Sequence, residues 1–401
     1  MRVCDVIERV MKDELSWRDA EDILGYTPRH MCRLRSMVLK DGISSVRDKR
    51  KGRVMPKAIP KEVVERVIAL RKERYHRFNI KHFHDKLTEE HRIAVSYTWL
   101  RNLMRHMGLL HGGREKGVHR MRRQRRPRTG MMLHQDGSEH AWLGEHRERC
   151  DLILILDDAD SRILYGRFVP EEGTKTCLEG LLFVLERYGL FSELYTDRGS
   201  HFTLTKTKGW PCEDGNVQIA RILRQLRIRP IYARSPQARG RSERTFGTFQ
   251  GRLPNELMDA GIETWEEANR YLNEVFIPDF NRRFTEPPTE PESAFIKADG
   301  IDLKRACALE HPVTVGKDNC VRWRRCIFQI PKQSSRPTFA RCKATLVEYL
   351  DGRVDIEYGQ LTLARFDEKG NPVPQPKDNA KCKRPHIPQY GAEYQHLGGH
   401  L

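Results

Sequence analysis

The sequence predicts a multi-domain α/β protein, with helical modules first, a mixed five-stranded sheet in the middle and a small β-barrel last. Three observations predict this organisation. Helical periods fill the first third of the chain, strands and helices alternate from residue 131, and runs rich in Val, Ile, Tyr and Phe occupy residues 311–366. The 401 residues allow several domains, expected at 1–50, 51–110, 111–130 (a linker), 131–298, 299–370 and 371–401 (a tail).

The first module contains two helices separated by a turn. A periodic segment over 17–24 ends at Gly25, and a second helix over 28–39 follows the capping residue Thr27. Helix, glycine-containing turn and helix is the helix-turn-helix pattern, although a plain helical hairpin has the same signature. The second helix exposes four side chains suited to phosphates and guanine edges: Arg29, His30, Arg33 and Arg35.

Three more helices are predicted at about 60–74, 80–91 and 96–107. The last has an apolar stripe that includes Leu100 and Met104, while Arg101 and Arg105 lie off it. This is a second candidate helix-turn-helix unit. His82, His84 and His91 lack the paired Cys partners of a zinc finger, so plain helices are expected here.

Residues 111–130 form a basic linker. Such a run cannot bury itself, and it is predicted to follow a phosphate backbone with an affinity that falls as salt rises. Its basic residues are Arg114, Lys116, Arg120, Arg122, Arg123, Arg125, Arg126 and Arg128.

The positive charge is concentrated in the first third of the chain. Residues 1–130 hold 33 Lys and Arg against 16 Asp and Glu, which accounts for the whole net charge of +17; residues 131–401 hold 39 of each. A basic arm on a neutral body predicts a polyanionic partner, and a solvated basic surface without a partner is the alternative.

Strands are predicted at about 131–139, 150–157, 162–169, 193–197 and 229–233, with helices near 174–188, 215–226 and 237–260. Short turns join the first three strands, which indicates an antiparallel meander, whereas the later strands need crossovers and should be parallel. This is the strand order of an RNase-H-like fold. After it, Asp351-Gly352 marks a hairpin turn within the predicted barrel, and the Pro- and Gly-rich tail should be loosely ordered.

The ten cysteines are scattered without a CxxC pair and are interpreted as reduced thiols of a cytoplasmic protein. No secretory signal is recognisable, and the most apolar helix, at 178–185, is too short to span a bilayer, so no membrane partner is expected.

Three carboxylates are predicted to carry the chemistry. Asp136 lies in the first strand, Asp197 ends the fourth, and Glu243 lies where a helix starts after the fifth. In the predicted fold the first and fourth strands are neighbours, so these side chains could meet. Two Mg²⁺ ions held by such oxygen ligands activate the attacking oxygen and stabilise the leaving oxygen of a phosphodiester; Mn²⁺ is expected to substitute.

The motifs resemble the DDE core of the integrase/transposase superfamily, and most closely bacterial insertion-sequence transposases of the ISNCY group. They read HQDGSEHAWL, ILDDADSRILYGRF, YTDRGSHF and SPQARGRSERTFGTFQ. The resemblance implies Asp136, Asp197 and Glu243 as the metal triad, with helix-turn-helix DNA binding and an SH3-like carboxy-terminal barrel. It also implies oligomers acting on paired double-stranded transposon ends, a strand hydrolysed to a 3′-hydroxyl, and joining to target DNA.

One position departs from the pattern. Many relatives carry Lys or Arg seven residues after the glutamate, where this chain has Gln250, so Arg241, Arg244 or Arg252 could contact DNA instead. Residues 206–215 are expected to form an inserted loop.

Several acidic and histidine side chains have structural interpretations. Asp157, Asp158 and Asp160 suit the turn between the second and third strands better than a metal site. His134 and His140 are expected to be structural and Trp142 to lie in the core, whereas His201 could approach the phosphate. Two alternatives stay open: a non-catalytic DNA-binding regulator with an integrase-like fold, and a nuclease acting on RNA–DNA hybrids.

Overall fold

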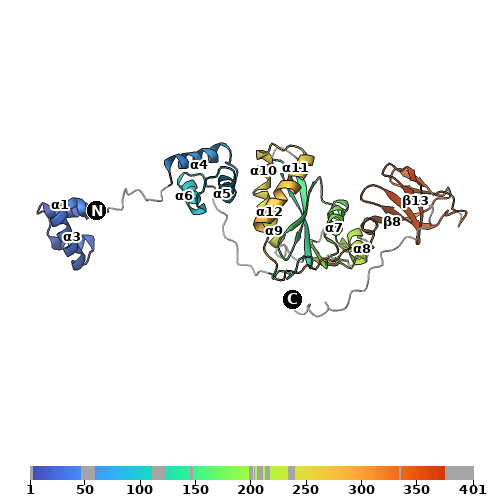
Figure 1. Cartoon of the computed structure of the whole chain (residues 1–401), viewed down its shortest axis with the longest axis horizontal. Coiled ribbons are helices and arrows are strands. Elements are labelled where there is room, and N and C mark those ends of the chain that lie inside the picture. The colour runs from blue at the N-terminus through green and yellow to red at the C-terminus, as the bar shows by residue number, and fades with distance from the viewer. Residues whose placement is uncertain are drawn as a thin grey trace. The chain divides into compact units, whose positions relative to one another are not determined.

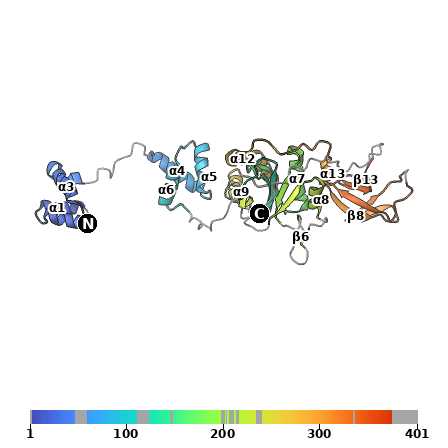
Figure 2. The ribbon, with the colours of Figure 1, turned by 90° about the horizontal axis from the view of Figure 1, so that it is seen from below.

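The computed structural model describes residues 3–46, 59–110, 123–144, 148–197, 202, 204–205, 211–212, 217–233, 240–333 and 336–374. The chain divides into two compact units, one of Met1–His76 with Lys86–Ala94 and one of Arg77–Asp85 with Val95–Leu401. Figures 1 and 2 show the helices and strands in two views. Among the described residues, none of the helices combines the length and the apolar character needed to cross a membrane.

The first unit opens with α1 (Val3–Met11), α2 (Trp17–Leu24), α3 (Pro28–Asp41) and the short η1 (Ile43–Val46). The Ser16 side chain and the Asp19 carboxylate cap the start of α2 reciprocally, and Gly25 ends the helix with φ of 62°. Apolar side chains of the three helices, among them Ile7, Ala20 and Leu34, form one core. The predicted pair of helices is therefore confirmed.

Three helices follow, α4 (Lys61–Glu73), α5 (Ile80–Glu89) and α6 (Tyr97–His106), close to their predicted ranges. The Ser96 side chain caps α6 by accepting from the backbone N–H of Trp99. Leu100 and Met104 are buried, as the apolar stripe predicted.

A five-stranded sheet forms the centre of the second unit. Its strands are β1 (Met132–His140), β2 (Cys150–Asp157), β3 (Ile163–Val169), β4 (Glu193–Thr196) and β7 (Arg229–Tyr232), in the order β3-β2-β1-β4-β7. The first three are antiparallel to one another, while β1–β4 and β4–β7 pair in parallel. The predicted RNase-H-like order and directions are both confirmed.

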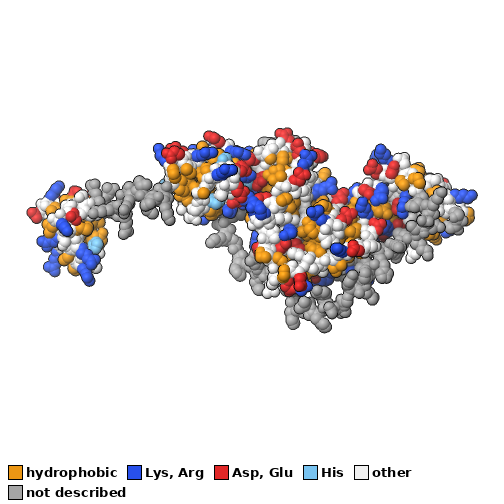
Figure 3. Space-filling model, viewed as in Figure 1, with side chains coloured by type: hydrophobic (Ala, Val, Ile, Leu, Met, Phe, Trp, Pro, Cys, Tyr) orange, Lys and Arg blue, Asp and Glu red, His pale blue; other side chains and the backbone are white. Residues whose placement is uncertain are grey.

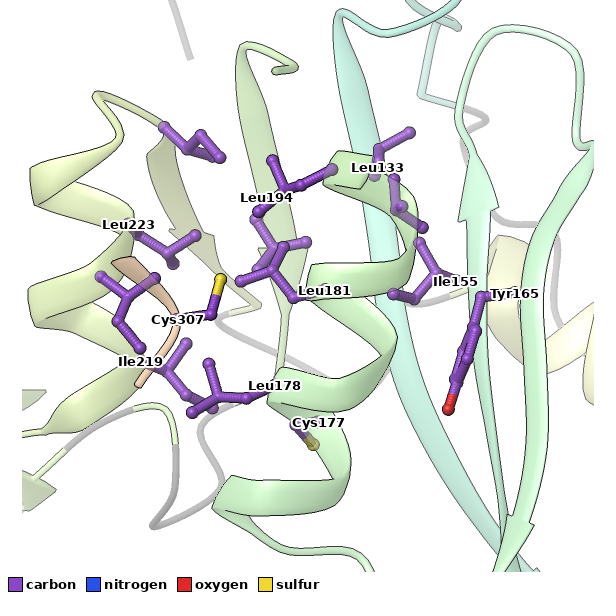
Figure 4. Packing of buried hydrophobic residues seen from close by; sticks show 14 of the residues in the cluster. Leu133, Ile155, Tyr165, Cys177, Leu178, Leu181, Leu194, Ile219, Leu223 and Cys307 are labelled. Atoms are coloured by element: carbon purple, nitrogen blue, oxygen red, sulfur yellow. The ribbon is translucent and has the colours of Figure 1, made fainter. Parts of the chain in front are cut away.

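Helices cover both faces of this sheet (Figure 1). On one face, α7 (Thr174–Tyr188) and α8 (Gln218–Gln225) pack through Leu178, Leu181 and Leu223 against Leu133 and Leu194 (Figure 4). The other face carries α9 (Gly240–Gln250), α10 (Leu253–Asp259), α11 (Trp265–Tyr271), the π-helical η3 (Leu272–Phe276) and α12 (Ile277–Phe284). Because β2 is buried on both faces, it reads as a continuous apolar run.

The single helix predicted at 237–260 is wrong, because the chain forms α9 and α10 with a break at Gly251 and Arg252. Pro254, in the first turn of α10, has no N–H to continue the earlier helix. In the region of the predicted inserted loop, β5 (Leu204–Thr205) pairs with β6 (Pro211–Cys212), and the rest of that loop lies outside the described residues.

The carboxy-terminal region contains a five-stranded antiparallel sheet and a separate two-stranded hairpin. The sheet runs β14 (Pro372–Val373), β13 (Leu361–Phe366), β12 (Val354–Tyr358), β11 (Lys343–Glu348) and β8 (Leu309–Thr314). The hairpin joins β9 (Cys320–Trp323) to β10 (Cys326–Gln329) and shares the apolar core of the sheet. An all-β region is confirmed, and closure into a barrel stays a prediction.

Before this region, α13 (Leu303–Ala306) packs on the preceding domain, because Ala306 and Cys307 belong to the core between α7 and the central sheet. Residues 375–401, most of the predicted tail, lie outside the described residues.

Candidate active site

Asp136 lies on β1 and Asp197 directly follows the neighbouring parallel strand β4. The last register pair of the two strands is His134 with Tyr195, and each aspartate comes two residues later in the chain. Since side chains alternate along a strand, both aspartates belong to the face occupied by His134 and Tyr195, whose rings lie 4.8 Å apart. Asp136 is 7% exposed and Asp197 is half-buried. The fold thus brings two of the three predicted carboxylates to one place.

Glu243 is carried by the first turn of α9, and its side chain is exposed. The helix packs against the sheet through the buried side chains of Ser242, Phe246 and Phe249. The residues before it, 234–239, lie outside the described residues.

Within the ranges that the structure describes, no group of three or more His, Cys, Asp or Glu side chains lies close enough together to hold a metal ion. The donor chemistry nevertheless fits Mg²⁺, which prefers carboxylate oxygens. Asp136 and Asp197 fit as an adjacent pair, whereas Glu243 does not complete the group in this conformation.

Asp158 is the centre of a buried polar network beside this pair. It is 0% exposed and accepts from His134 Nε2 at 2.8 Å and from the backbone N–H of Arg126 at 2.8 Å. The guanidinium groups of Arg123 and Arg241 pair with the same carboxylate. Burial, with the nearby charges of Arg123 and Arg241, lowers the pKa of His134 to about 3, so this imidazole is neutral at pH 7.

The other two aspartates of the β2–β3 turn also accept backbone hydrogen bonds. Asp157 accepts from the N–H groups of Gly130 at 2.7 Å and Ala159 at 2.8 Å, and Asp160 accepts from that of Arg162 at 2.8 Å. Their structural interpretation is therefore confirmed. Trp142 is fully buried, as predicted, and its Nε1 donates to the Ser138 carbonyl at 3.1 Å.

The described part of the predicted basic linker, residues 123–130, forms ion pairs with carboxylates of the core instead of extending away from it. Besides the Arg123 pair, Arg125 Nη2 lies 3.0 Å from Glu286 and Arg126 Nη2 lies 2.8 Å from Glu193. The expectation of an unburied run is wrong for this stretch, because carboxylates of the core compensate its charges. Arg122 and the earlier basic residues lie outside the described residues.

The predicted DNA-binding side chains of α3, α6 and α9 include five exposed arginines, whereas the candidate Arg252 is buried. Arg29 and Arg33 lie on the face of α3 opposite the buried Met31 and Leu34, and the surface of this module displays many Lys and Arg side chains (Figure 3). Arg101 and Arg105 of α6 are exposed, as is Arg244 of α9. Arg252 is only 6% exposed, with its guanidinium 5.3 Å from the centre of the Phe284 ring. His201 lies outside the described residues.

The structure places one further carboxylate, that of Glu172, against Gly137, the residue after Asp136; the sequence did not predict it. Glu172 precedes α7, and its side chain fills the space where a Cβ on Gly137 would stand. Its Oε1 accepts from Cys177 Sγ at 3.6 Å. Together with burial, the nearby charges of Glu172, Asp197 and Asp151 raise the pKa of the Cys177 thiol. The one available sequence signal was an acidic pair, Glu171-Glu172, just before a predicted helix.

No family model matches the chain. Two curated proteins are similar to it in sequence. "Putative transposase y4bF" of Sinorhizobium fredii (strain NBRC 101917 / NGR234) is 31% identical over 288 residues, which are 72% of this chain and 63% of that protein. The transposase for insertion sequence IS1202 of Streptococcus pneumoniae is 31% identical over 263 residues, 57% of this chain and 56% of that protein. The chain thus spans about three-fifths of the length of the curated relatives it matches.

Solved structures of retroviral integrases overlap the chain weakly. The HTLV-2 integrase catalytic core domain in complex with magnesium is 14% identical, covers 37% of this chain and 89% of its own, and has a TM-score of 0.28. A simian T-cell lymphotropic virus intasome in complex with the PP2A regulatory subunit B56 gamma is also 14% identical, covers 67% and 91%, and has a TM-score of 0.34.

Proposed function

We propose that this chain, which is related in sequence to insertion-sequence transposases, is itself a DNA transposase. It would bind the ends of a mobile element, hydrolyse a DNA strand to expose a 3′-hydroxyl and join that hydroxyl to target DNA. The observation that carries the proposal is that Asp136 and Asp197 each come two residues after the last register pair of the parallel strands β1 and β4. Such a pair presents hard oxygen ligands at one edge of a rigid sheet.

The proposed metal ligands are Asp136, Asp197 and Glu243. Two Mg²⁺ ions, or Mn²⁺ in their place, would activate the attacking oxygen and stabilise the leaving oxygen at the phosphate. The pairing of β1 with β4 supports a shared site for Asp136 and Asp197, which the exposed Glu243 would have to approach. We propose that, when DNA and metal bind, the exposed Glu243 side chain turns towards the pair while α9 keeps its place on the sheet.

The helical modules are proposed to hold DNA. The exposed arginines of α3 and α6, Arg29, Arg33, Arg101 and Arg105, suit guanine edges and phosphates. Arg244 on α9 would meet the phosphate backbone near the cleavage site. The protein is expected to act on double-stranded DNA as a homo-oligomer, since two element ends are joined together.

Replacing Asp197 with Asn tests the proposal. The change keeps the side-chain volume and removes the carboxylate, so strand cleavage in Mg²⁺ should fall by at least about a hundredfold, as when a group acting on the reacting centre is lost. Binding of labelled element-end DNA should stay unchanged, because base readout lies on other elements. Asp299→Asn, at an exposed position, is the matched control and should cleave normally.

The same assay separates the alternatives. A non-catalytic regulator would bind end DNA without cleaving it in any form of the protein. A nuclease acting on RNA–DNA hybrids would cleave a hybrid in preference to the element end. Normal cleavage by Asp197→Asn would remove this residue from the site.

A further inference from the structure

Two polar pairs hold α9, one near each end of the helix. Gln250 contacts β1 directly, and Arg241 is linked to β1 through Asp158, in the turn after β2. Near its start, Arg241 pairs with Asp158, which also accepts from His134 of β1. At its end, Gln250 Nε2 donates to Ser138 Oγ of β1 at 3.1 Å. His134 and Ser138 lie two residues before and two residues after Asp136, on the same face of the strand. The two pairs therefore flank the central carboxylate of the candidate site.

The spacing of the two pairs matches along the helix and the strand. Gln250 lies nine positions after Arg241, a distance of about 14 Å along the helix at a rise of about 1.5 Å per residue. Ser138 lies four positions after His134, a distance of about 13 Å along the strand at about 3.3 Å per residue. The helix therefore runs along β1 in the direction of the strand. A shift by one helical turn would break both pairs.

The Arg241 pair is expected to resist rearrangement. Asp158 is fully buried, and removing a compensating charge from a buried carboxylate strongly destabilises the folded state. The compensating charges are the guanidinium groups of Arg123 and Arg241, which both pair with this carboxylate. The Arg241 side chain is only 18% exposed, and its Nη2 also donates to the Arg123 carbonyl at 2.7 Å.

We propose that Arg241 and Gln250 are positioning residues that fix the register of α9 on β1 and so hold Glu243 at the level of Asp136. Glu243 lies about 3 Å beyond Arg241 along the helix, and Asp136 lies about 7 Å beyond His134 along the strand, a difference of less than one helical turn. The inference rests on the proposed function. In this proposal Arg241 binds Asp158 inside the protein instead of the DNA phosphate that the sequence suggested. Gln250, which stands where many relatives carry Lys or Arg, holds α9 on β1.

The test compares Arg241→Gln, Gln250→Ala and Arg241→Lys with the exposed control Arg270→Gln of α11, in the full chain. Four quantities are measured: hydrogen exchange of the α9 amides, Mn²⁺ affinity by calorimetry, the dissociation constant for element-end DNA, and single-turnover cleavage. Gln250→Ala removes one neutral hydrogen bond at a half-buried site, so this variant stays folded even if Arg241→Gln does not.

Arg241→Gln and Gln250→Ala should each speed exchange in α9, weaken Mn²⁺ binding by about tenfold and slow cleavage, as with other residues that orient metal ligands. Arg241→Lys should recover part of the loss, DNA affinity should not change, and the control should match the parent protein. Two outcomes overturn the inference: unchanged exchange and Mn²⁺ affinity in both variants, or a loss confined to DNA affinity, which would make Arg241 a DNA contact. Glu243→Gln, measured in parallel, separates this failure from that of the proposed function, since normal cleavage by that variant rejects the triad itself.

Discussion

Phe249 shows how single side chains hold α9 in place. It is fully buried, and its ring lies 4.9 Å from the rings of both Phe276 and Phe280. Phe249→Ala should lower the free energy of unfolding by about 3–5 kcal/mol, the cost of lost burial together with the cavity left behind. Phe183→Ala, on the 42%-exposed side chain of α7, should cost about 1 kcal/mol or less. Urea unfolding of both variants measures the difference, and equal losses would contradict this packing.

Asp157 should make stability depend on pH. Burial is the main cause that raises the pKa of this carboxyl to about 6, above its unfolded value near 4. The folded state therefore binds the proton more tightly. Protonated Asp157 therefore adds at most about 3 kcal/mol to the free energy of unfolding. This stabilisation is fully present below about pH 4 and is lost as pH rises through about 6.

The measurement is the free energy of unfolding of the parent protein minus that of Asp157→Asn, at several pH values from 4 to 7. This difference should fall across the window and then level off. Asp299→Asn, at an exposed position, serves as the control for the substitution itself. A difference that rose with pH would reverse the assigned direction of the pKa shift.

At the scale of single residues, local patterns were informative and long-range networks were not. Asp136 and Asp197 could be singled out because each lies at a defined place on a predicted strand. Asp158 could be assigned to a turn, but its partners Arg123, His134 and Arg241 come from three distant segments. No periodicity or spacing connects such residues, so only the folded chain reveals the network.

Among the helices, α3 provides the sharpest test of DNA recognition. Arg33 is exposed on the helix that follows the Gly25 turn. If α3 enters the major groove, Arg33→Ala should weaken specific binding to element ends by about 1–3 kcal/mol while binding to unrelated DNA changes little. Arg18→Ala, exposed on α2, should have a smaller effect. Fluorescence titrations with both DNAs measure this, and equal effects of the two variants would reject α3 as the reading helix.

The boundaries of helices were predictable where caps and glycines mark them. Gly25 and Thr27 act at the ends of helices as predicted, and the structure adds Ser16 and Ser96 as N-caps. The break between α9 and α10 was missed because apolar periodicity continues through Gly251, although Pro254 signals it. Runs of β-prone residues predicted the carboxy-terminal strands, but closure of a barrel depends on pairing between strand edges, which composition does not encode.

For the whole molecule, the sequence predicted the order of the central sheet because connection length decides strand direction. Short turns gave the β1–β2–β3 meander, and crossovers placed β4 and β7 in parallel. The sequence also showed that the excess of Lys and Arg lies in residues 1–130, but not which of these side chains pair within the protein. The arginines that follow residue 122 are paired with core carboxylates, whereas those of α3 are exposed.

The proposed strand cleavage requires Asp136, Asp197 and Glu243 to share metal ions when DNA is bound. The most direct measurement is the anomalous scattering of Mn²⁺ in crystals of the protein with element-end DNA. The expected result is two Mn²⁺ positions about 3.5–4 Å apart, both touching Asp136, with Asp197 and Glu243 each bound to one of them. A DNA complex with no Mn²⁺ beside Asp136 and Asp197, or with Glu243 still remote from them, would contradict it.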